Sequence, residues 1–273
     1  MAVGENALAA FLLAVARTAG FVLVSPPFST KAVPARVKAG LAVALALPVS
    51  GYLQPTAPAL SSTALVLQMV LQVVMGVTLG FLVLVAVAAI QAVGDLLDVV
   101  GGFTISMALD PLLLVQTSVL GRLHQLFAVT LLFVTDGHLM IVQGLARSLQ
   151  TMPTPQVSWD ELGRVITQDV GGLLLAALQV AAPVVAAMLV ADVGLGLLTR
   201  AAPALNAFAL AMPLKILFTL LLAGLVVARV PEALHGLVEH AVLTQIDLTG
   251  GGATPAPTPV ATAVPIPVPG AGP

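Results

Sequence analysis

From Ala39 to Gly94 the chain contains no Asp, Glu, Lys, Arg or His. A run of this length without such residues can only be solvated by lipid or by other protein, because a water-soluble domain carries charged side chains on its surface. The rest of the chain has the same character: 59% of its 273 residues are apolar, 8% are charged, and the mean hydropathy is +1.10. The sequence therefore predicts a protein that is integral to a membrane and has no soluble domain.

Hydrophobic runs separated by turn and charge signals predict about six membrane helices and an all-α, polytopic fold. The expected runs are 7–24, 39–53, 63–94, 112–134, 169–199 and 203–228. At 1.5 Å per residue the third and fifth would be roughly 46–48 Å long, whereas a bilayer core is about 30 Å thick, so these helices must tilt, kink or pack as hairpins against other protein. Within the third run, the spacing of Gly76 and Gly80 permits a close helix crossing, although it is common by chance in glycine-rich helices.

The C-terminal segment has a different composition. It is rich in Pro, Ala and Thr, and its prolines at every second or third position favour polyproline II over packed structure. We expect a single helical domain over residues 1–248 and a disordered tail over residues 249–273.

The sequence lacks the motifs of the common catalytic centres. H-E-x-x-H, G-x-S-x-G, the Walker loop and G-x-G-x-x-G are all absent. Cysteine is absent too, which excludes disulfides, thiolate catalysis and Cys-based metal sites. The scattered basic residues form no stripe that could neutralise phosphates, so nucleic acid is not an expected partner. We expect neither an enzyme nor a cofactor.

Asp95 and Asp98 form an acidic pair that could share a proton or a metal, because they lie at i and i+3 on one helix face. They fall where the third hydrophobic run ends, next to Gly101-Gly102. We interpret them as a solvated helix end. An intramembrane hydrolase built on this pair is a weaker alternative, since no orienting motif accompanies it.

Three ionisable residues lie inside hydrophobic runs: Arg17, Asp192 and Lys215. Each costs about 2.5–3.5 kcal/mol at the centre of a membrane helix, so each should face a partner group, a water-filled path or another subunit. If the last two runs form an antiparallel hairpin, Asp192 lies about 13 Å below the turn and Lys215 about 20 Å. The two residues are near each other but not level, and the long lysine side chain could cover the gap. Structural pairing and a transport role are both open on this ground.

Three stretches together resemble the family of flagellar biosynthetic protein FliR and its virulence counterparts in type III secretion. They are RTAGFVLVSPPFSTKAVPARVKAGLA (17–42), GDLLDVVGGFTISMALDP (94–111) and ADVGLGLLTRAAPALNAFALAMPLKI (191–216). The resemblance covers residues 1 to about 245 in order, and the last stretch is its most specific part. The positions there that match the family are Asp192, Gly196, Arg200, Pro203, Asn206, Pro213 and Lys215.

The resemblance implies a non-enzymatic structural subunit of the type III (flagellar) protein export gate, which forms part of the channel for unfolded export substrates. It implies FliP-like and FliQ-like partner subunits, adjoining FlhB-like and FlhA-like components, and a place in the bacterial inner membrane at the flagellar basal body. We expect Arg17, Asp192, Arg200 and Lys215 to be buried charges that serve assembly. The alternative is a stand-alone small-solute carrier or ion channel whose path is lined by Arg17, Asp192 and Lys215.

The segment 101–121 is interpreted as a pore plug. Gly101-Gly102 and Asp110-Pro111 interrupt helix on either side of a short apolar stretch. A flexible apolar loop at membrane depth is tolerated only when it packs in protein or lines a cavity, so we expect it inside the channel. The family's corresponding segment closes the export pore from within, and an ordinary interhelical turn packed against FliP-like neighbours is the alternative. The expected plug residues are Phe103, Ile105, Met107, Leu109, Asp110 and Pro111.

Overall fold

The structure of the chain, a computed structural model, describes residues 2–60, 62–103, 118–155, 159–201 and 207–250. Within these ranges every regular element is a helix, which confirms the all-α prediction. Five helices are long and apolar enough to cross a membrane, or six if the bent pair α5–α6 counts as one span, in agreement with the number expected. The elements are α1 (Ala2–Val24), α2 (Ala35–Ala46), the 3-10 helix η1 (Leu47–Thr56), α3 (Thr63–Gly101), α5 (Val119–Val134), α6 (Gly137–Thr151), α7 (Trp159–Ala201) and α8 (Ala207–Gly250).

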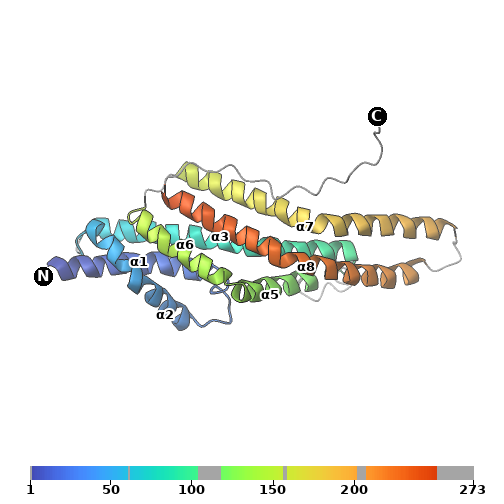
Figure 1. Ribbon diagram of the computed structural model, residues 1–273, viewed down its shortest axis with the longest axis horizontal. Coiled ribbons are helices and arrows are strands. Elements are labelled where there is room, and N and C mark those ends of the chain that lie inside the picture. Colours follow the sequence, from blue (N-terminus) through green and yellow to red (C-terminus); the bar gives the residue numbers. More distant parts are fainter. Residues whose placement is uncertain (1, 61, 104–117, 156–158, 202–206, 251–273) are drawn as a thin grey trace, which may run out of the picture.

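The helices form an elongated bundle around α3, which contacts α1, α5, α7 and α8 (Figure 1). Helices α1, α2 and η1 gather toward the end of the bundle where the N-terminus lies. Helices α7 and α8 pack together, and the C-terminal end of α7 and the N-terminal end of α8 extend beyond the other helices at the opposite end. The main hydrophobic core lies between α3 and its neighbours, and the fully buried α3 side chains Leu79, Leu82, Ile90 and Leu97 belong to it.

Small residues bring α1 and α3 into backbone contact. A Cβ atom on Gly20 would lie 2.6 Å from the carbonyl oxygen of Val73, and one on Gly80 would lie 2.8 Å from that of Phe21. A Cβ on Gly76 would overlap the carbonyl oxygen of Arg17. The spacing of Gly76 and Gly80 therefore does mark a close helix crossing, which fixes the depth of α1 against α3.

Several helices extend further than their hydrophobic runs, and α7 already begins at Trp159, ten residues before its run 169–199. The run 63–94 continues as α3 to Gly101, where Gly102, with φ 78°, ends the helix in the left-handed conformation. The run 203–228 corresponds to α8, which begins at Ala207 and continues to Gly250. The hydropathy pattern predicts the C-terminal end of α8 too early because the outer face of the helix becomes charged after residue 228. The inner face stays buried, and its buried residues follow helical spacing: Val230, Leu234, Leu237, Val238 and Ala241. The expected tail can thus begin no earlier than residue 251.

Candidate functional site

Arg17 is fully buried and ties three parts of the chain together. Its Nε donates to Gln72 Oε1 on α3 at 2.6 Å. Its two terminal nitrogens donate to the carbonyl oxygens of Ser148, at 2.6 Å, and Met152, at 2.7 Å. The Gln72 amide in turn donates to the carbonyl oxygen of Pro153 at 2.6 Å. Each of the three guanidinium nitrogens therefore has a partner within this chain.

The charge of Arg17 is stabilised by the end of a helix. Ser148 and Met152 lie in the last turn and at the C-cap of α6, where the helix dipole is negative. The Ser148 carbonyl also accepts the backbone N–H of Met152 at 3.2 Å, whereas the Met152 carbonyl lies beyond the last helical hydrogen bond. The guanidinium satisfies these carbonyls and places its positive charge where the dipole favours it. Arg17 thus joins α1, α3 and α6 through its hydrogen bonds. It is therefore not available to line a transport path, as the carrier alternative requires.

Asp192 and Lys215 meet between α7 and α8. Lys215 Nζ lies 2.9 Å from Asp192 Oδ2, so the pair expected from the hairpin register is present. The side chains are 20% exposed for Lys215 and 41% for Asp192. One turn further along α8, the hydroxyl of the buried Thr219 donates to the carbonyl oxygen of Lys215 at 2.9 Å, and its oxygen lies 3.7 Å from the sulfur of Met188 on α7. Thr219 also lies against Gly101 at the end of α3, so the ion pair sits close to the point where α3 ends.

Within this chain Asp192 and Lys215 are only partly buried and Arg200 is exposed, so the burial of these three charges in an assembly stays a prediction. Arg200 is exposed in the last turn of α7. The reason is its position at the C-terminal end of α7, which extends beyond the other helices (Figure 1). A basic residue in the last turn of a helix is favoured by the helix dipole without burial.

The interpretation of Asp98 as a solvated helix end is also wrong. Asp98 is 2% exposed, and its Oδ2 accepts hydrogen bonds from the Ser118 hydroxyl and from the backbone N–H of Leu120, the latter at 3.1 Å. Asp95, one turn earlier, lies against the backbone of Gly121. Both carboxylates therefore face the beginning of α5, which packs closely on this part of α3. Their contacts are structural, and they give the hydrolase alternative no support.

Two further polar contacts were not anticipated. His240 Nε2 lies 3.2 Å from Asp169 Oδ1 across the α7–α8 hairpin, and Gln245 Nε2 donates to the carbonyl oxygen of Leu79 at 2.9 Å. The contact between His240 and Asp169 could have been inferred from the sequence, because the antiparallel pairing of α7 and α8 that brings Asp192 to Lys215 also brings Asp169 close to His240. The contact of Gln245 could not be inferred from the sequence, because one uncharged amide among other polar residues at a helix end does not indicate a buried contact.

Of the expected plug residues, only Phe103 lies in the described part of the chain. Its backbone N–H donates to the carbonyl oxygen of Asp98 at 3.1 Å, just after Gly102 ends α3. Ile105, Met107, Leu109, Asp110 and Pro111 lie outside the described residues.

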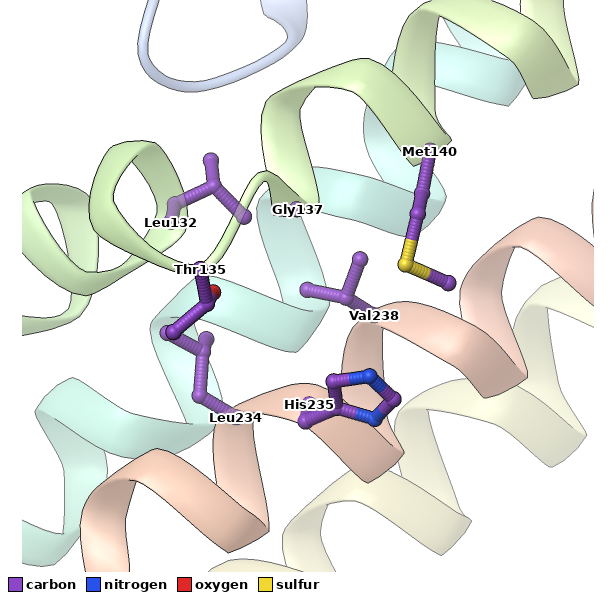
Figure 2. Close-up of a pocket in the computed structure, with 7 residues that line it drawn as sticks. All are labelled: Leu132, Thr135, Gly137, Met140, Leu234, His235 and Val238. Atoms are coloured by element: carbon purple, nitrogen blue, oxygen red, sulfur yellow. The ribbon is translucent and has the colours of Figure 1, made fainter.

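Figure 2 shows a small hollow between the α5–α6 bend and α8. It is lined by Leu132, Thr135, Gly137, Met140, Leu234, His235 and Val238. His235 is the only titratable side chain in this lining, so the hollow brings together no pair of groups for acid–base chemistry. Across the described residues, no three His, Asp or Glu side chains lie together as metal ligands.

These observations define a class of protein: a polytopic, all-helical membrane protein in which buried polar side chains join helices. Its two C-terminal helices form a long apolar hairpin with an ion pair. Residues 8–241 match the family described as Bacterial export proteins, family 1, and the chain belongs to this family.

Named relatives agree with this assignment. The flagellar biosynthetic protein FliR of Pectobacterium carotovorum subsp. carotovorum is 29% identical over 244 residues, which cover 89% of this chain and 92% of the relative. FliR of Bacillus subtilis is 27% identical over 211 residues, covering 76% and 82%. Yop proteins translocation protein T of Yersinia pestis is 33% identical over 148 residues, covering 53% and 56%. The resemblance seen in the sequence is confirmed.

Proposed function

We propose that the chain is a structural, non-enzymatic subunit of a type III protein export gate and forms part of the channel for unfolded substrates. Its relatives are named for flagellar biosynthesis and for Yop protein translocation, which supports this role. The gate stands in the bacterial inner membrane, at the base of the flagellum in the flagellar case. Its other members are FliP-like and FliQ-like subunits, with FlhB-like and FlhA-like components beside them.

The exposed α7–α8 hairpin is the observation that carries this proposal. In an apolar 18-residue window of α1 and of α3, 56% and 61% of the residues are buried within the chain, against 24% in α7 and 17% in α8. The shorter span formed by α2 and η1 is also little covered, at 22%. The exposed side chains are mostly leucines and valines, among them Leu189, Val190, Val193, Leu217 and Leu221. Apolar helices that leave so much surface uncovered need either lipid or protein around them.

The ion pair favours protein as the main neighbour of the hairpin. Asp192 and Lys215 keep substantial exposed surface within this apolar region. Charged groups facing lipid are costly, and they are normally found against the interior of a bundle, a water-filled path or another subunit. Neighbouring gate subunits would cover the leucines and complete the surroundings of the pair.

Assembly is tested by co-expressing a tagged chain with FliP-like and FliQ-like subunits from one bacterium and extracting them in mild detergent. We expect the three to elute as one complex, and the chain expressed alone to aggregate. The proposal would be refuted if the chain were a monodisperse monomer that unfolds in one sharp thermal transition and does not bind these partners. Truncation after Gly250, which leaves every described helix intact, serves as the control variant.

We propose further that the segment beginning at Phe103 seals the channel of the assembled gate. Support comes from its apolar sequence and from the place where α3 ends, beside α8 and close to the Asp192–Lys215 pair. Bulky, adaptable side chains such as Phe and Met suit a seal that substrates must displace. Deletion of residues 104–109 should raise the ion leak of the assembled complex without abolishing assembly. An unchanged leak in an intact complex would show that the segment is not the plug.

A further inference from the structure

Helix α2 lies at the edge of the bundle (Figure 1) and, among the described elements, contacts only α1 and η1. Its inner face packs on α1, where the Thr18 hydroxyl donates to the carbonyl oxygen of Ala42 at 2.9 Å. Ala42 and Ala46 are the buried residues of this inner face. The opposite face of α2 is left open by the rest of the described chain.

This outer face of α2 changes from charged to apolar along the helix. It is formed by four exposed residues whose spacing of three and four places them on one side: Arg36, Gly40, Val43 and Leu47. Val43 is 40% exposed and Leu47 is 61% exposed. A Cβ atom on Gly40 would meet no atom within 4 Å, so nothing covers the middle of the outer face.

The charged end of the outer face is basic and has no acidic partner. Exposed Lys31 lies in the loop before α2, and Lys38 Nζ donates to the carbonyl oxygen of Ser29 at 2.9 Å, which ties this loop to the helix. The sequence has no Asp or Glu over residues 6–94. Among the described residues, neither Lys31 nor Arg36 forms an ion pair. The positive charge at this end is therefore not compensated within the described chain.

The order of groups on the outer face favours lipid as its neighbour. A phospholipid presents a charged head followed by apolar chains, and basic residues at a membrane surface attract anionic headgroups. From Val37 to Leu47 every exposed residue is apolar, so this part of the face offers no polar side chain that could orient a protein partner. The α7–α8 hairpin differs, because there the charges of Asp192 and Lys215 lie within the apolar region.

We propose that the outer face of α2 binds an anionic phospholipid of the membrane. Lys31 and Arg36 contact the negatively charged headgroup, and Val43 and Leu47 lie against an acyl chain. This contact requires only that the chain lies in a membrane, and it is independent of the export partners proposed above.

The contact is measured with one fluorophore, because the chain has no cysteine of its own. Val43→Cys is labelled with bimane in the full-length chain, purified with the subunits that it retains and reconstituted in vesicles of phosphatidylglycerol and phosphatidylcholine. Brominated acyl chains on one or the other lipid quench the fluorophore on contact, and the two quenching curves give the relative binding constant of the lipids. The chain without the substitution, treated in the same way, gives the background from other subunits.

We expect phosphatidylglycerol to be favoured at Val43. Each basic residue near an anionic surface changes the binding constant by roughly fivefold, so Lys31→Ala and Arg36→Ala should each lower the preference by about this factor. Arg36→Lys should keep most of it because the charge remains. High salt should weaken the preference of the unmutated basic end, since it screens exposed charges.

Two matched controls separate this effect from a general affinity for anionic lipid. Arg229→Ala removes an exposed arginine from α8, which does not contact α2, and should leave the preference at Val43 unchanged. A bimane on Val70→Cys reports an exposed site of α3 within the uncharged run 39–94, and both lipids should quench it equally.

Three results would overturn the proposal. Equal quenching of Val43→Cys by the two lipids would show that the face does not select an anionic headgroup. Weak quenching there by both lipids, with strong quenching at Val70→Cys, would show that protein covers α2. A preference that persists in the Lys31→Ala, Arg36→Ala double variant would show that these residues do not hold the headgroup.

Discussion

Replacing Arg17 with methionine removes the guanidinium that joins α1, α3 and α6 but keeps a long side chain to fill its space. Three strong acceptors are lost from contact: Gln72 Oε1 at 2.6 Å, Ser148 O at 2.6 Å and Met152 O at 2.7 Å. At about 1.5–3 kcal/mol for each hydrogen bond to a charged group, the gross loss is several kcal/mol. Methionine avoids the desolvation cost of the buried charge, so we expect a net loss of about 3–5 kcal/mol.

The loss is measured as the melting temperature of the purified complex. A domain of 150–250 residues loses about 2–4 °C per kcal/mol, so the expected fall is about 6–20 °C. Arg17→Lys should lie between the wild type and methionine, because a point charge on a flexible chain cannot donate in three fixed directions.

Arg122→Ala provides the control for this experiment. Arg122 is an exposed arginine whose side chain bonds Gln125 one turn away on the same helix. Its loss should change stability by less than about 0.5 kcal/mol. If Arg17→Met melts within 2 °C or so of Arg122→Ala, Arg17 does not join the helices in the way described.

Three further sets of variants test the helix crossing, the ion pair and the tail. Gly76→Ala should prevent assembly of a stable fold because its Cβ would overlap backbone, whereas Gly171→Ala, which faces open space, should be neutral or stabilising by up to about 1 kcal/mol in thermal melts. Asp192→Ala and Lys215→Ala should each lower the yield of complex, and the double variant should do less harm than their sum; strict additivity would contradict direct coupling. Truncation after Gly250 should leave membrane insertion and complex yield intact, since a proline-rich tract buries too little surface to offset its ordering; loss of the complex would show that the tail docks.

The helical class and the family could be predicted from the sequence, because both depend on local signals. Hydrophobic length marked the membrane helices, and the motif around Asp192 and Lys215 carried the family resemblance. Antiparallel register brought Asp192 and Lys215 near enough for an ion pair to be one of the expected possibilities. Such features need only the sequence distance between residues and the geometry of a helix.

The environment of Arg17 and Asp98 could not be predicted, because it depends on which helix ends meet in three dimensions. The charge of Arg17 is stabilised by backbone carbonyl groups at the end of α6, more than 130 residues away in the sequence. Because every residue has a backbone carbonyl, the amino-acid types there do not identify these partners. Asp98 looked like a polar helix end next to two glycines. Asp98 is buried because Ser118, at the beginning of α5, packs against it. The hydropathy of the sequence does not show that these two residues meet.

Loss of the chain should stop protein export if the chain is part of the export gate. The experiment deletes its gene from the bacterium that encodes it and measures type III substrates in the culture medium. We expect export to be lost, to return with the wild-type gene, and to return poorly with Asp192→Ala. Export at the wild-type level in the deletion strain, with the rest of the apparatus present and no second copy of the gene, would contradict the account.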